Sequence, residues 1–481
     1  MNGLVEALEG KDLFEILTFA AEAYNDSTAV TDRGGDGAWR DHSYRALFDD
    51  AETLAGILQD RYAPGTHIAL CAGNSYRWIL TFFGIVCSGN IAVLLDREMT
   101  DSELENALRL TDAQLLVTDR PLPAGGVPGF GLDEFPGDPG PAAGRLVHRH
   151  DDLSPAIFLM TSGVTSSPKC VVLSQANLIY STLCGLDAVP LERGLSTLSV
   201  LPPHHSFELC TGILYHIMSG SRIIVNDRKE NFIKNLYAFR PDCLVTVPTV
   251  VLALLSLLKA DLANHRDSAV SGLKYIYCGG AAISPAIIDE MKAHGVLVLQ
   301  GYGMTECSPG ITFNHLDDVT SDTVGTPMKY VSLRLEQGEI LVKGPNVMLG
   351  YYKNEAATRQ VLRDGWLRTG DVGRLDEKGR LILCGRVRNV IVLSSGENVY
   401  PEELEEKVLF ADPAVKYCRV YEENGMIAAE VFAPQLDREA IQAVVDRVNG
   451  EVSKFKRIRR LAVLPELPPV TALGKAIRRD P

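Results

Sequence analysis

Apolar runs of strand length alternate with helix-length stretches over much of the chain, and this alternation limits the fold more than any other feature. Between residues 67 and 119 the strand-like runs are HIALCA, IAVLLD and AQLLVTD, and the same rhythm returns between 197 and 303. Runs that are apolar at nearly every position are typical of strands buried on both faces. Helical stretches between such strands form crossovers, so the sequence predicts buried parallel sheets in an α/β fold.

The pattern changes after about residue 330. The segments LRLEQGEILVKG and GRLDEKGRLILCGR each carry a polar, glycine-containing turn between apolar runs, which predicts two antiparallel hairpins. Further along, helices are expected from Pro401 to about Phe410 and from Arg438 to Val448. A hinge is predicted at 386–389, dividing the chain into a large domain, 1–386, and a small one, 387–481. The Pro- and Gly-rich segment 121–145 is expected to be irregular.

Composition excludes several classes of protein. The formal net charge of -14 argues against a nucleic-acid binder. The 10 cysteines include no CxxC pair, which indicates reduced thiols and no zinc knuckle. The most apolar run, VVLALLSLL, is too short to span a bilayer, and the first residues lack the basic region of a signal peptide. We therefore expect a cytoplasmic protein without a transmembrane segment. No G-x-G-x-x-G opens a βαβ unit, which argues against a hydride-transfer enzyme.

The stretch TSGVTSSPK begins at Thr161 and gathers hydroxyl groups and one lysine between two apolar runs. Taken alone, it is typical of a polar hairpin turn. A phosphate cradle is the alternative, because hydroxyls and exposed backbone N–H groups donate to phosphate oxygens and a lysine adds positive charge. The spacing is not that of a Walker loop, since no second glycine precedes Lys169 and no hydroxyl follows it.

A second loop supplies groups suited to a magnesium-bound nucleotide. QGYGMTECSPG ends an apolar run with two glycines and then offers Tyr302, Thr305 and Glu306. A carboxylate such as Glu306 is usually just a solvated loop acid. Beside phosphates, however, it is a natural Mg²⁺ ligand, because magnesium prefers one or two carboxylates together with phosphate and water oxygens.

Three segments nearer the C-terminus complete the set. WLRTGDVG offers Asp371, whose carboxylate could accept hydrogen bonds from the two hydroxyls of a ribose. CGRVRNVIVLSSGENVYPEELE supplies Arg386, and PPVTALGKAIRRD supplies Lys475. A lysine so close to the end of a chain is usually a free surface charge. The five segments in this order nevertheless resemble the adenylate-forming superfamily: acyl-CoA synthetases, nonribosomal-peptide adenylation domains and luciferases. The resemblance spans essentially the whole chain.

The resemblance implies a fold and a reaction. The fold is a large N-terminal domain with mixed and parallel sheets and a β-barrel-like part, followed by a small mobile α+β domain. The reaction has two halves: a carboxylate attacks MgATP to give an acyl-adenylate and pyrophosphate, and a thiol then attacks the adenylate. Between the halves the C-terminal domain would swing about a hinge, at which Arg388 stands. The implied cofactors are ATP, Mg²⁺ and CoA.

The resemblance also implies a role for each segment. The first loop would hold phosphates through Thr161, Ser162, Gly163, Thr165 and Lys169. The loop CGGAAIS would lie along the adenine at Gly279, Gly280 and Ala281. Tyr302, followed by Gly303, would stack on the base, and Asp371 would bind the ribose with help from Arg386. The remaining residues act at the reacting groups: Thr305 at the α-phosphate, Glu306 with Thr161 at Mg²⁺, and Lys475 between the carboxylate and the α-phosphate, where an anion attacks an anion.

The phosphate loop departs from the usual pattern of the superfamily, TSGTTGxPKG. Val164 replaces a threonine, and Ser166 and Cys170 replace glycines. We interpret these changes as tuning, because Thr161 and Lys169 remain among the retained residues. A weakly active or non-catalytic protein is the alternative hypothesis, and it predicts no pyrophosphate release with any acid.

The stretch LPPHHSFELC bears on the substrate, because it looks like that of long-chain acyl-CoA synthetases. It implies an acyl pocket formed by His205, which is also a candidate catalytic residue, with Phe207, Val247 and Val250. A medium- or long-chain fatty acid is the expected substrate. Glu208 has two interpretations of equal weight. It is either the glutamate that long-chain acyl-CoA synthetases often carry at this place, or an acid at a helix N-terminus that interacts with the helix dipole. The expected acceptor is CoA, and the alternative is the phosphopantetheine thiol of an acyl carrier protein.

Overall fold

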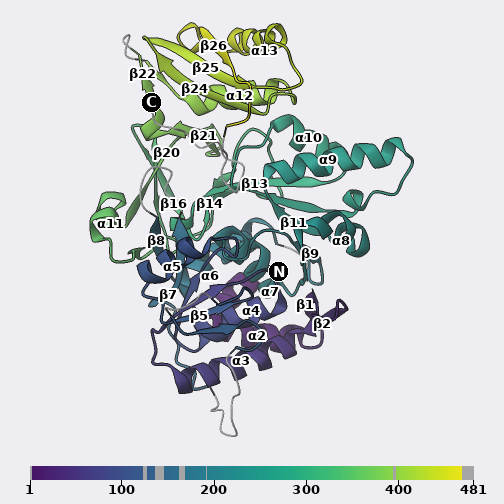
Figure 1. Ribbon diagram of the computed structural model, residues 1–481, viewed down its shortest axis with the longest axis vertical. Helices are drawn as coiled ribbons and strands as arrows, with labels where there is room; N and C mark the ends of the chain where they lie inside the picture. Colours follow the sequence, from purple (N-terminus) through teal and green to yellow (C-terminus); the bar gives the residue numbers. More distant parts are fainter. Residues whose placement is uncertain are drawn as a thin grey trace.

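The computed structural model describes residues 3–122, 127–135, 146–161, 168–190, 192–393 and 397–468. Figure 1 shows two large sheets with helices packed on them, a smaller antiparallel sheet beside them, and a layer formed by the C-terminal elements at the top. Within the described ranges, no helix is both long enough and apolar enough to cross a membrane.

A seven-stranded sheet contains the first of the predicted strand series. In spatial order its strands are β18 (Gly350–Tyr351), β8 (Lys169–Ser174), β7 (Pro155–Thr161), β4 (Ile91–Leu94), β3 (His67–Cys71), β5 (Leu115–Thr118) and β6 (Gly129–Gly131). The five strands from β7 to β6 pair in parallel, whereas β8 and β18 are antiparallel. The crossovers contain α4 (Tyr76–Cys87) and α5 (Asp101–Leu110). The predicted parallel sheet with helical crossovers is confirmed.

One expectation about this sheet is wrong. The segment 121–145 was expected to be irregular, but Gly129–Gly131 forms the edge strand β6, which pairs in parallel with β5. The glycines permit this, because Gly129 lies so close to Leu122 that an added Cβ would stand 2.4 Å from its Cδ2. Edge pairing through the backbone needs little help from side chains, so composition did not reveal it.

A nine-stranded sheet contains the second series. Its strands are β15 (Thr326–Pro327), β14 (Gly310–Phe313), β13 (Leu297–Gly303), β12 (Tyr275–Cys278), β11 (Cys243–Thr246), β9 (Ser196–Ser199), β10 (Arg222–Val225), β1 (Thr28–Arg33) and β2 (Trp39–Ser43). The strands from β13 to β1 are parallel and the outer ones antiparallel. Parallel strands present their carboxyl ends at one edge, which is where ligand sites form in open α/β sheets.

Helices pack on these two sheets. They are α1 (Leu4–Leu8), α2 (Leu13–Tyr24), α3 (Tyr44–Arg61), α6 (Gln175–Ala188), α7 (Tyr215–Ser219), α8 (Phe232–Phe239), α9 (Pro248–Ala263) and α10 (Pro285–Ala293). A π-helical turn, Glu208–Leu214, leads directly into α7. Several helices begin at a side-chain cap. Ser174 caps α6 by accepting from the backbone N–H of Asn177 at 3.2 Å, which ends β8 and starts the helix within one residue.

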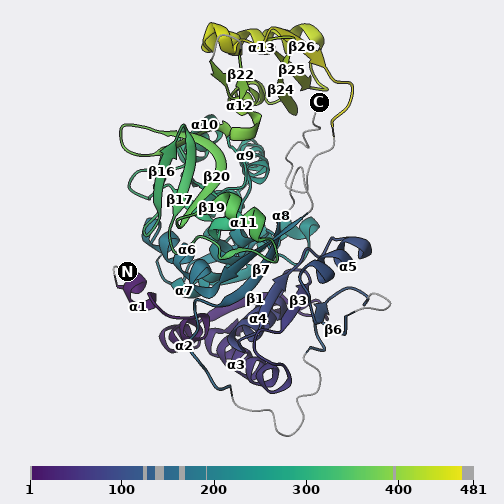
Figure 2. The ribbon, with the colours of Figure 1, turned by 90° about the vertical axis from the view of Figure 1, so that its left-hand side faces the viewer.

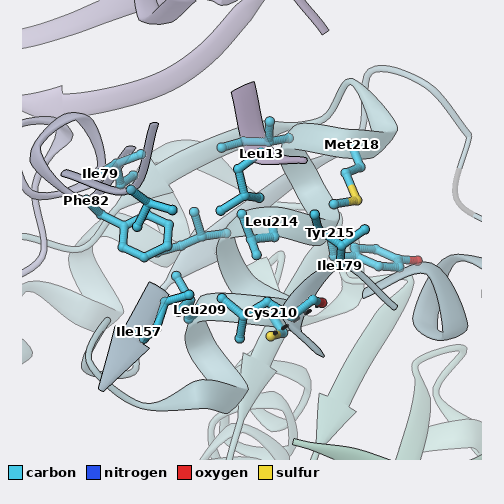
Figure 3. Packing of buried hydrophobic residues seen from close by; sticks show 14 of the residues in the cluster. Leu13, Ile79, Phe82, Ile157, Ile179, Leu209, Cys210, Leu214, Tyr215 and Met218 are labelled. Carbon is cyan, nitrogen blue, oxygen red and sulfur yellow. Dashed lines mark hydrogen bonds between the residues drawn. The ribbon is translucent and has the colours of Figure 1, made fainter. Parts of the chain in front are cut away.

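The largest apolar core lies among the helices between the two sheets. Figure 3 shows side chains from different elements meeting there, among them Leu13 of α2, Phe82 of α4, Ile157 of β7 and Leu209 of the π-helical turn. All four are at most 2% exposed. Full burial of each such side chain contributes about 1.5–3 kcal/mol to stability. This shared core fixes the two sheets, and hence the ends of their strands, relative to each other.

The predicted hairpins form a five-stranded antiparallel sheet. It contains β16 (Ser332–Glu336), β17 (Glu339–Lys343), β19 (Leu362–Arg363), β20 (Trp366–Leu375) and β21 (Leu381–Arg386), and α11 (Glu355–Val361) precedes β19. The first hairpin turns at Gln337 and Gly338, whose φ angles of 52° and 87° are both positive. Two consecutive positive φ angles are typical of a type I′ turn, which suits the twist of a hairpin.

The C-terminal elements form a layer with its own apolar core. They follow the 3₁₀ turn Val387–Asn389 and are β22 (Ile391–Val392), β23 (Asn398–Val399), α12 (Pro401–Ala411), β24 (Tyr417–Glu423), β25 (Met426–Phe432), α13 (Arg438–Glu451) and β26 (Arg460–Val463). Figure 2 shows this layer at one end of the molecule, and α12 contacts β21. The predicted fold class, a large α/β part followed by a small α+β part, is confirmed. The boundary at 386/387 remains a prediction.

Candidate active site

A tyrosine, a carboxylate and a guanidinium from three strands meet at the end of β13. Tyr302 donates its hydroxyl proton to Asp371 Oδ2 at 2.7 Å, and Arg386 Nε lies 3.0 Å from Asp371 Oδ1. Asp371 and Arg386 are directly opposed in the pairing of β20 with β21. Burial, followed by the negative charge of Asp371, raises the pKa of Tyr302 well above its usual value, so the phenol stays a donor. The cluster brings together three residues that the sequence predicted for the nucleoside.

A second cluster joins the loop after β13 to the seven-stranded sheet. Glu306, in the 3₁₀ turn Thr305–Cys307, accepts a hydrogen bond from the Tyr351 hydroxyl at 2.8 Å. Lys169 Nζ lies 4.9 Å from the centre of the Tyr351 ring. Across β7 and β8, Thr161 is opposite Lys169 and donates to its carbonyl oxygen at 3.3 Å. The Tyr351 side chain therefore contacts both an acid and an ammonium group, and the Thr161 hydroxyl is bonded to the backbone of the same lysine.

The composition of this second cluster suits a magnesium–phosphate group. Glu306 is buried, so its carboxylate needs a partner of opposite charge or a hydrogen-bond donor. A divalent cation meets that need and also binds phosphate oxygens, and Lys169 can neutralise part of the phosphate charge. The predicted metal ligands Glu306 and Thr161 fit the ion by donor type. Tyr351 was missed by sequence reasoning, although it follows the glycine of β18 next to an apolar run.

Glycines at the strand ends leave room for close approach. At Gly303, which is exposed, an added Cβ would lie 1.9 Å from the carbonyl oxygen of Pro309, so only glycine fits. At Gly279, which directly follows β12, an added Cβ would lie 3.2 Å from Cζ of Phe207. Gly280 has a φ of +82°, and Ala281 is exposed. This loop therefore runs past the end of the sheet with little side-chain volume of its own.

Two of the residues predicted for the acyl pocket border this loop, and we call the predicted set the candidate acyl wall: His205, Phe207, Val247 and Val250. Phe207 packs toward Gly279, and Cγ1 of Val247 would lie 3.7 Å from a Cβ on Gly280. Val250 is half-buried in the first turn of α9. The structure thus places Phe207 and Val247 against this loop, whereas Val250 packs against the apolar core beneath α9.

The imidazole of His205 is neutral at ordinary pH. Its ring centre lies 4.2 Å from that of His204, and His204 Nε2 lies 3.9 Å from Asp96 Oδ2. Burial disfavours the charged ring, lowering the pKa of His205 and lowering that of His204 to about 3. A neutral imidazole can line an apolar pocket, whereas an imidazolium there would need a counter-ion.

The other predicted residues divide into two groups. Thr305 is half-buried in the turn with Glu306, and Arg388 is exposed in the turn Val387–Asn389. Ser162, Gly163, Thr165 and Lys475, and with them the substitutions at Val164 and Ser166, lie outside the described residues. Cys170 is described and is buried in β8.

Comparison with known proteins identifies the class. The AMP-binding enzyme family matches residues 17–352. A 2-succinylbenzoate–CoA ligase from Bacillus cereus is 30% identical over 434 residues, covering 86% of this chain and 88% of that protein. The o-succinylbenzoate CoA synthetase of Bacillus subtilis, solved with its acyl-adenylate, superposes with a TM-score of 0.81 at 23% identity and 96% coverage of both chains. An anthranilate CoA ligase solved with anthranoyl-AMP superposes with a TM-score of 0.84 at 21% identity, covering 98% of this chain and 97% of that one.

The chain belongs to the AMP-binding enzyme family. It is an adenylate-forming acid–CoA ligase, and the predicted use of ATP, Mg²⁺ and CoA is confirmed with the class.

Proposed function

We propose that this enzyme converts a medium- or long-chain fatty acid into its CoA thioester. In the first half-reaction a carboxylate oxygen attacks the α-phosphorus of MgATP, and the bond to the β-phosphate breaks to release pyrophosphate. In the second, the CoA thiol loses its proton and attacks the acyl carbon, and AMP leaves. The candidate acyl wall is the observation that carries the choice of acid.

The candidate acyl wall supports an apolar acid because its side chains offer apolar surface and a neutral imidazole. Phe207 lies beside Gly279 and Val247 beside Gly280, and His205 is uncharged. Each methylene buried against such a wall contributes about 0.8 kcal/mol to binding. Affinity should therefore rise with chain length until the pocket is full.

The nucleotide groups support the proposed roles in the first half-reaction. Asp371, held by Tyr302 and Arg386, would accept the ribose hydroxyls. Glu306 and Thr161 would hold Mg²⁺, which would screen the phosphate charges, while Lys169 would neutralise the departing pyrophosphate. Thr305 and Lys475 would act at the α-phosphate, where negative charge accumulates during attack.

The second candidate is an aromatic acid of the 2-succinylbenzoate type. The relative from Bacillus cereus, which carries that name, covers most of this chain at 30% identity. Phe207 could stack on an aromatic ring as well as pack against an alkyl chain. The two candidates predict different results when the chain length of the acid is varied. Activity should rise with chain length for a fatty-acid enzyme, whereas an enzyme for an aromatic acid should show no such rise.

Pyrophosphate release tests the proposal directly. The purified enzyme is given MgATP with saturated acids of increasing length and with benzoate, anthranilate and 2-succinylbenzoate, each with and without CoA. We expect release that grows with chain length to a cutoff and multiplies with CoA. A best substrate among the aromatic acids would replace the first candidate by the second.

Two further outcomes of the same assay address the alternatives. Slow release that CoA does not accelerate, but that a phosphopantetheinylated carrier protein does, would replace CoA by the carrier as acceptor. No release with any acid would favour the weakly active or non-catalytic alternative, with Val164, Ser166 and Cys170 as the suspected cause.

A further inference from the structure

A fully buried carboxyl group follows Phe207 directly in the chain. Glu208, the first residue of the π-helical turn, is 0% exposed. Its carboxyl occupies the space beside Gly212, where an added Cβ would lie 2.4 Å from Glu208 Cδ. π-Helical turns are rare and frequent at functional sites, and here the turn adjoins the candidate acyl wall. The mechanism proposed above does not use this group.

Glu208 connects the candidate acyl wall to both large sheets. Its Oε1 accepts a short hydrogen bond from the hydroxyl of Ser199, the last residue of β9 in the nine-stranded sheet. Ser199 Oγ in turn accepts from Asn74 Nδ2 at 2.5 Å, and Asn74 follows β3 in the seven-stranded sheet. We call Asn74, Ser199 and Glu208 the strand-end network. It spans the carboxyl ends of two strands and the start of the turn that follows Phe207.

The strand-end network contains two polar atoms without a described partner. Glu208 Oε2 and Asn74 Oδ1 are both buried and accept no hydrogen bond from a described residue. A buried carboxylate in this position would carry an uncompensated charge, whereas a protonated carboxyl would not. Burial raises the pKa of Glu208 to about 8, against the weaker opposite effect of the Ser199 bond. The neutral form therefore predominates near pH 7.

We infer that Glu208 is a positioning residue of the candidate acyl wall: through Ser199 and Asn74 it holds the Phe207 segment at a fixed place between the two sheets. This inference rests on the proposed function, because it assigns the wall to acid binding. Glutamine is the matched replacement, since its amide has the shape of a protonated carboxyl and keeps an acceptor for Ser199. Alanine removes the connection.

Among the described titratable groups discussed next, Glu208 is the one expected to change charge just above pH 7. Burial keeps three histidines neutral. It lowers the pKa of His205, and it lowers the pKa of His204 and the pKa of His216 to about 3. In α6, burial raises the pKa of the Cys184 thiol to about 12 and also raises the pKa of the Tyr180 phenol. Burial likewise raises the pKa of Cys210 in the π-helical turn, of Tyr215 in α7 and of Cys243 in β11. Asp187 of α6 is paired with Lys329 at 3.4 Å.

Steady-state kinetics of Glu208→Ala and Glu208→Gln test the inference, with Asp261→Asn as the control. Asp261 is a buried carboxylate of α9, eleven residues along the helix from Val250, and it accepts a hydrogen bond from Tyr237 of α8. We expect Glu208→Ala to raise KM for the acid about tenfold, the cost of one lost buried hydrogen bond, while KM for MgATP stays within about twofold. Glu208→Gln should restore KM for the acid at pH 7, and the control should leave both KM values unchanged.

The pH profile provides a readout that folding defects in the alanine variant cannot obscure. For the wild type, kcat/KM for the acid should fall as pH rises through about 8, because ionised Glu208 carries a buried charge. Glu208→Gln should abolish that fall. Equal effects of Glu208→Ala on both substrates, or a glutamine variant with the wild-type profile, would overturn the inference. A wild-type enzyme that turns over no acid of the panel would instead overturn the proposed function.

Discussion

Asp371 is the residue for which we propose a role in binding the ribose. Both of its oxygens are already engaged, one by the Tyr302 hydroxyl and the other by the Arg386 guanidinium. These partners fix the carboxylate before any ligand arrives, which lowers the entropic cost of binding.

We predict that Asp371→Asn weakens ATP binding with little effect on folding. An asparagine cannot accept from two donors and two hydroxyls as a carboxylate does, and a hydrogen bond to a charged group is worth about 1.5–3 kcal/mol. The KM for ATP should therefore rise about tenfold to a hundredfold. Asp376→Asn is the matched control, because Asp376 lies in the same hairpin and is paired with Arg380 at 2.7 Å. An equal change in the control would contradict the assignment.

Glu306 leads to a prediction about magnesium. Replacing its carboxylate by the amide of Glu306→Gln keeps the hydrogen bond from Tyr351 but removes the charge that a divalent cation needs. The Mg²⁺ concentration for half-maximal activity should rise about tenfold or more. The measurement is a Mg²⁺ titration of pyrophosphate release. Glu339→Gln, which alters a carboxylate paired with Arg368, should leave the titration unchanged.

Glu208 makes stability depend on pH in a definite direction. Its pKa of about 8 in the folded protein exceeds the value of 4.5 in the unfolded chain, so the folded state holds a proton that the unfolded state has lost. Its contribution to stability is complete below about pH 4.5 and is lost as pH rises to about 8, at about 1.4 kcal/mol per pH unit. Glu208→Gln does not titrate.

Unfolding in denaturant checks this dependence. The free energy of unfolding of Glu208→Gln minus that of the wild type should increase between pH 5.5 and pH 8. The other titratable groups are common to both proteins, so their effects cancel in the difference. An unchanged difference across that range would show that Glu208 is ionised in the folded protein.

At the scale of elements, the antiparallel pairing of β13 with β14 places the turn that carries Thr305 and Glu306. The turn closes on itself where the backbone N–H of Met304 donates to the carbonyl oxygen of Pro309 at 2.9 Å. Gly303 stands against that same carbonyl, and no side chain fits there. The position of the predicted metal ligand therefore depends on a glycine three residues before it.

Gly303→Ala should disturb this turn. The added methyl group would overlap the Pro309 carbonyl, and overpacking of this kind costs about 1–3 kcal/mol. We expect a lower melting temperature and a loss of pyrophosphate release. Gly272→Ala is the control, since an added Cβ at Gly272 meets nothing within 4 Å. If the two variants behaved alike, the close approach at Gly303 would not matter.

At the scale of the molecule, the C-terminal layer has its own core and joins the rest through the turn Val387–Asn389. Lys475 belongs to the chain beyond the described part of this layer. If the C-terminal domain alternates between the half-reactions, as the family resemblance implies, this lysine acts in only one of them. The two halves can be measured separately.

Lys475→Ala should impair adenylation about a hundredfold or more, because no other cation is proposed between the attacking carboxylate and the α-phosphate. Thioester formation from supplied acyl-adenylate and CoA should remain near wild type. Lys416→Ala, a change at a lysine that donates to the carbonyl of Pro413, should affect neither half. Equal loss of both halves in Lys475→Ala would argue against domain alternation.

Much of the fold and of the candidate site could be predicted because their signals are local. The apolar runs IALC and YIYC lie in β3 and β12, since burial on both faces requires apolar residues at nearly every position. Tyr302 and Asp371 stood in short glycine-containing motifs that form the end of β13 and part of β20, and Glu306 stood in the turn that follows β13. The edge strand β6 was missed because backbone pairing leaves little trace in side-chain pattern.

Contacts between distant segments could not be predicted in this way. By itself the sequence determined the two series of buried parallel strands, their crossovers, the hairpins and the loops that carry polar groups, because hydrophobic period and turn chemistry act over a few residues. Only the tertiary structure decided that Tyr351 stands between Lys169 and Glu306, and that Asn74, Ser199 and Glu208 form one network. Those arrangements depend on how two sheets pack around a shared core, which no local pattern encodes.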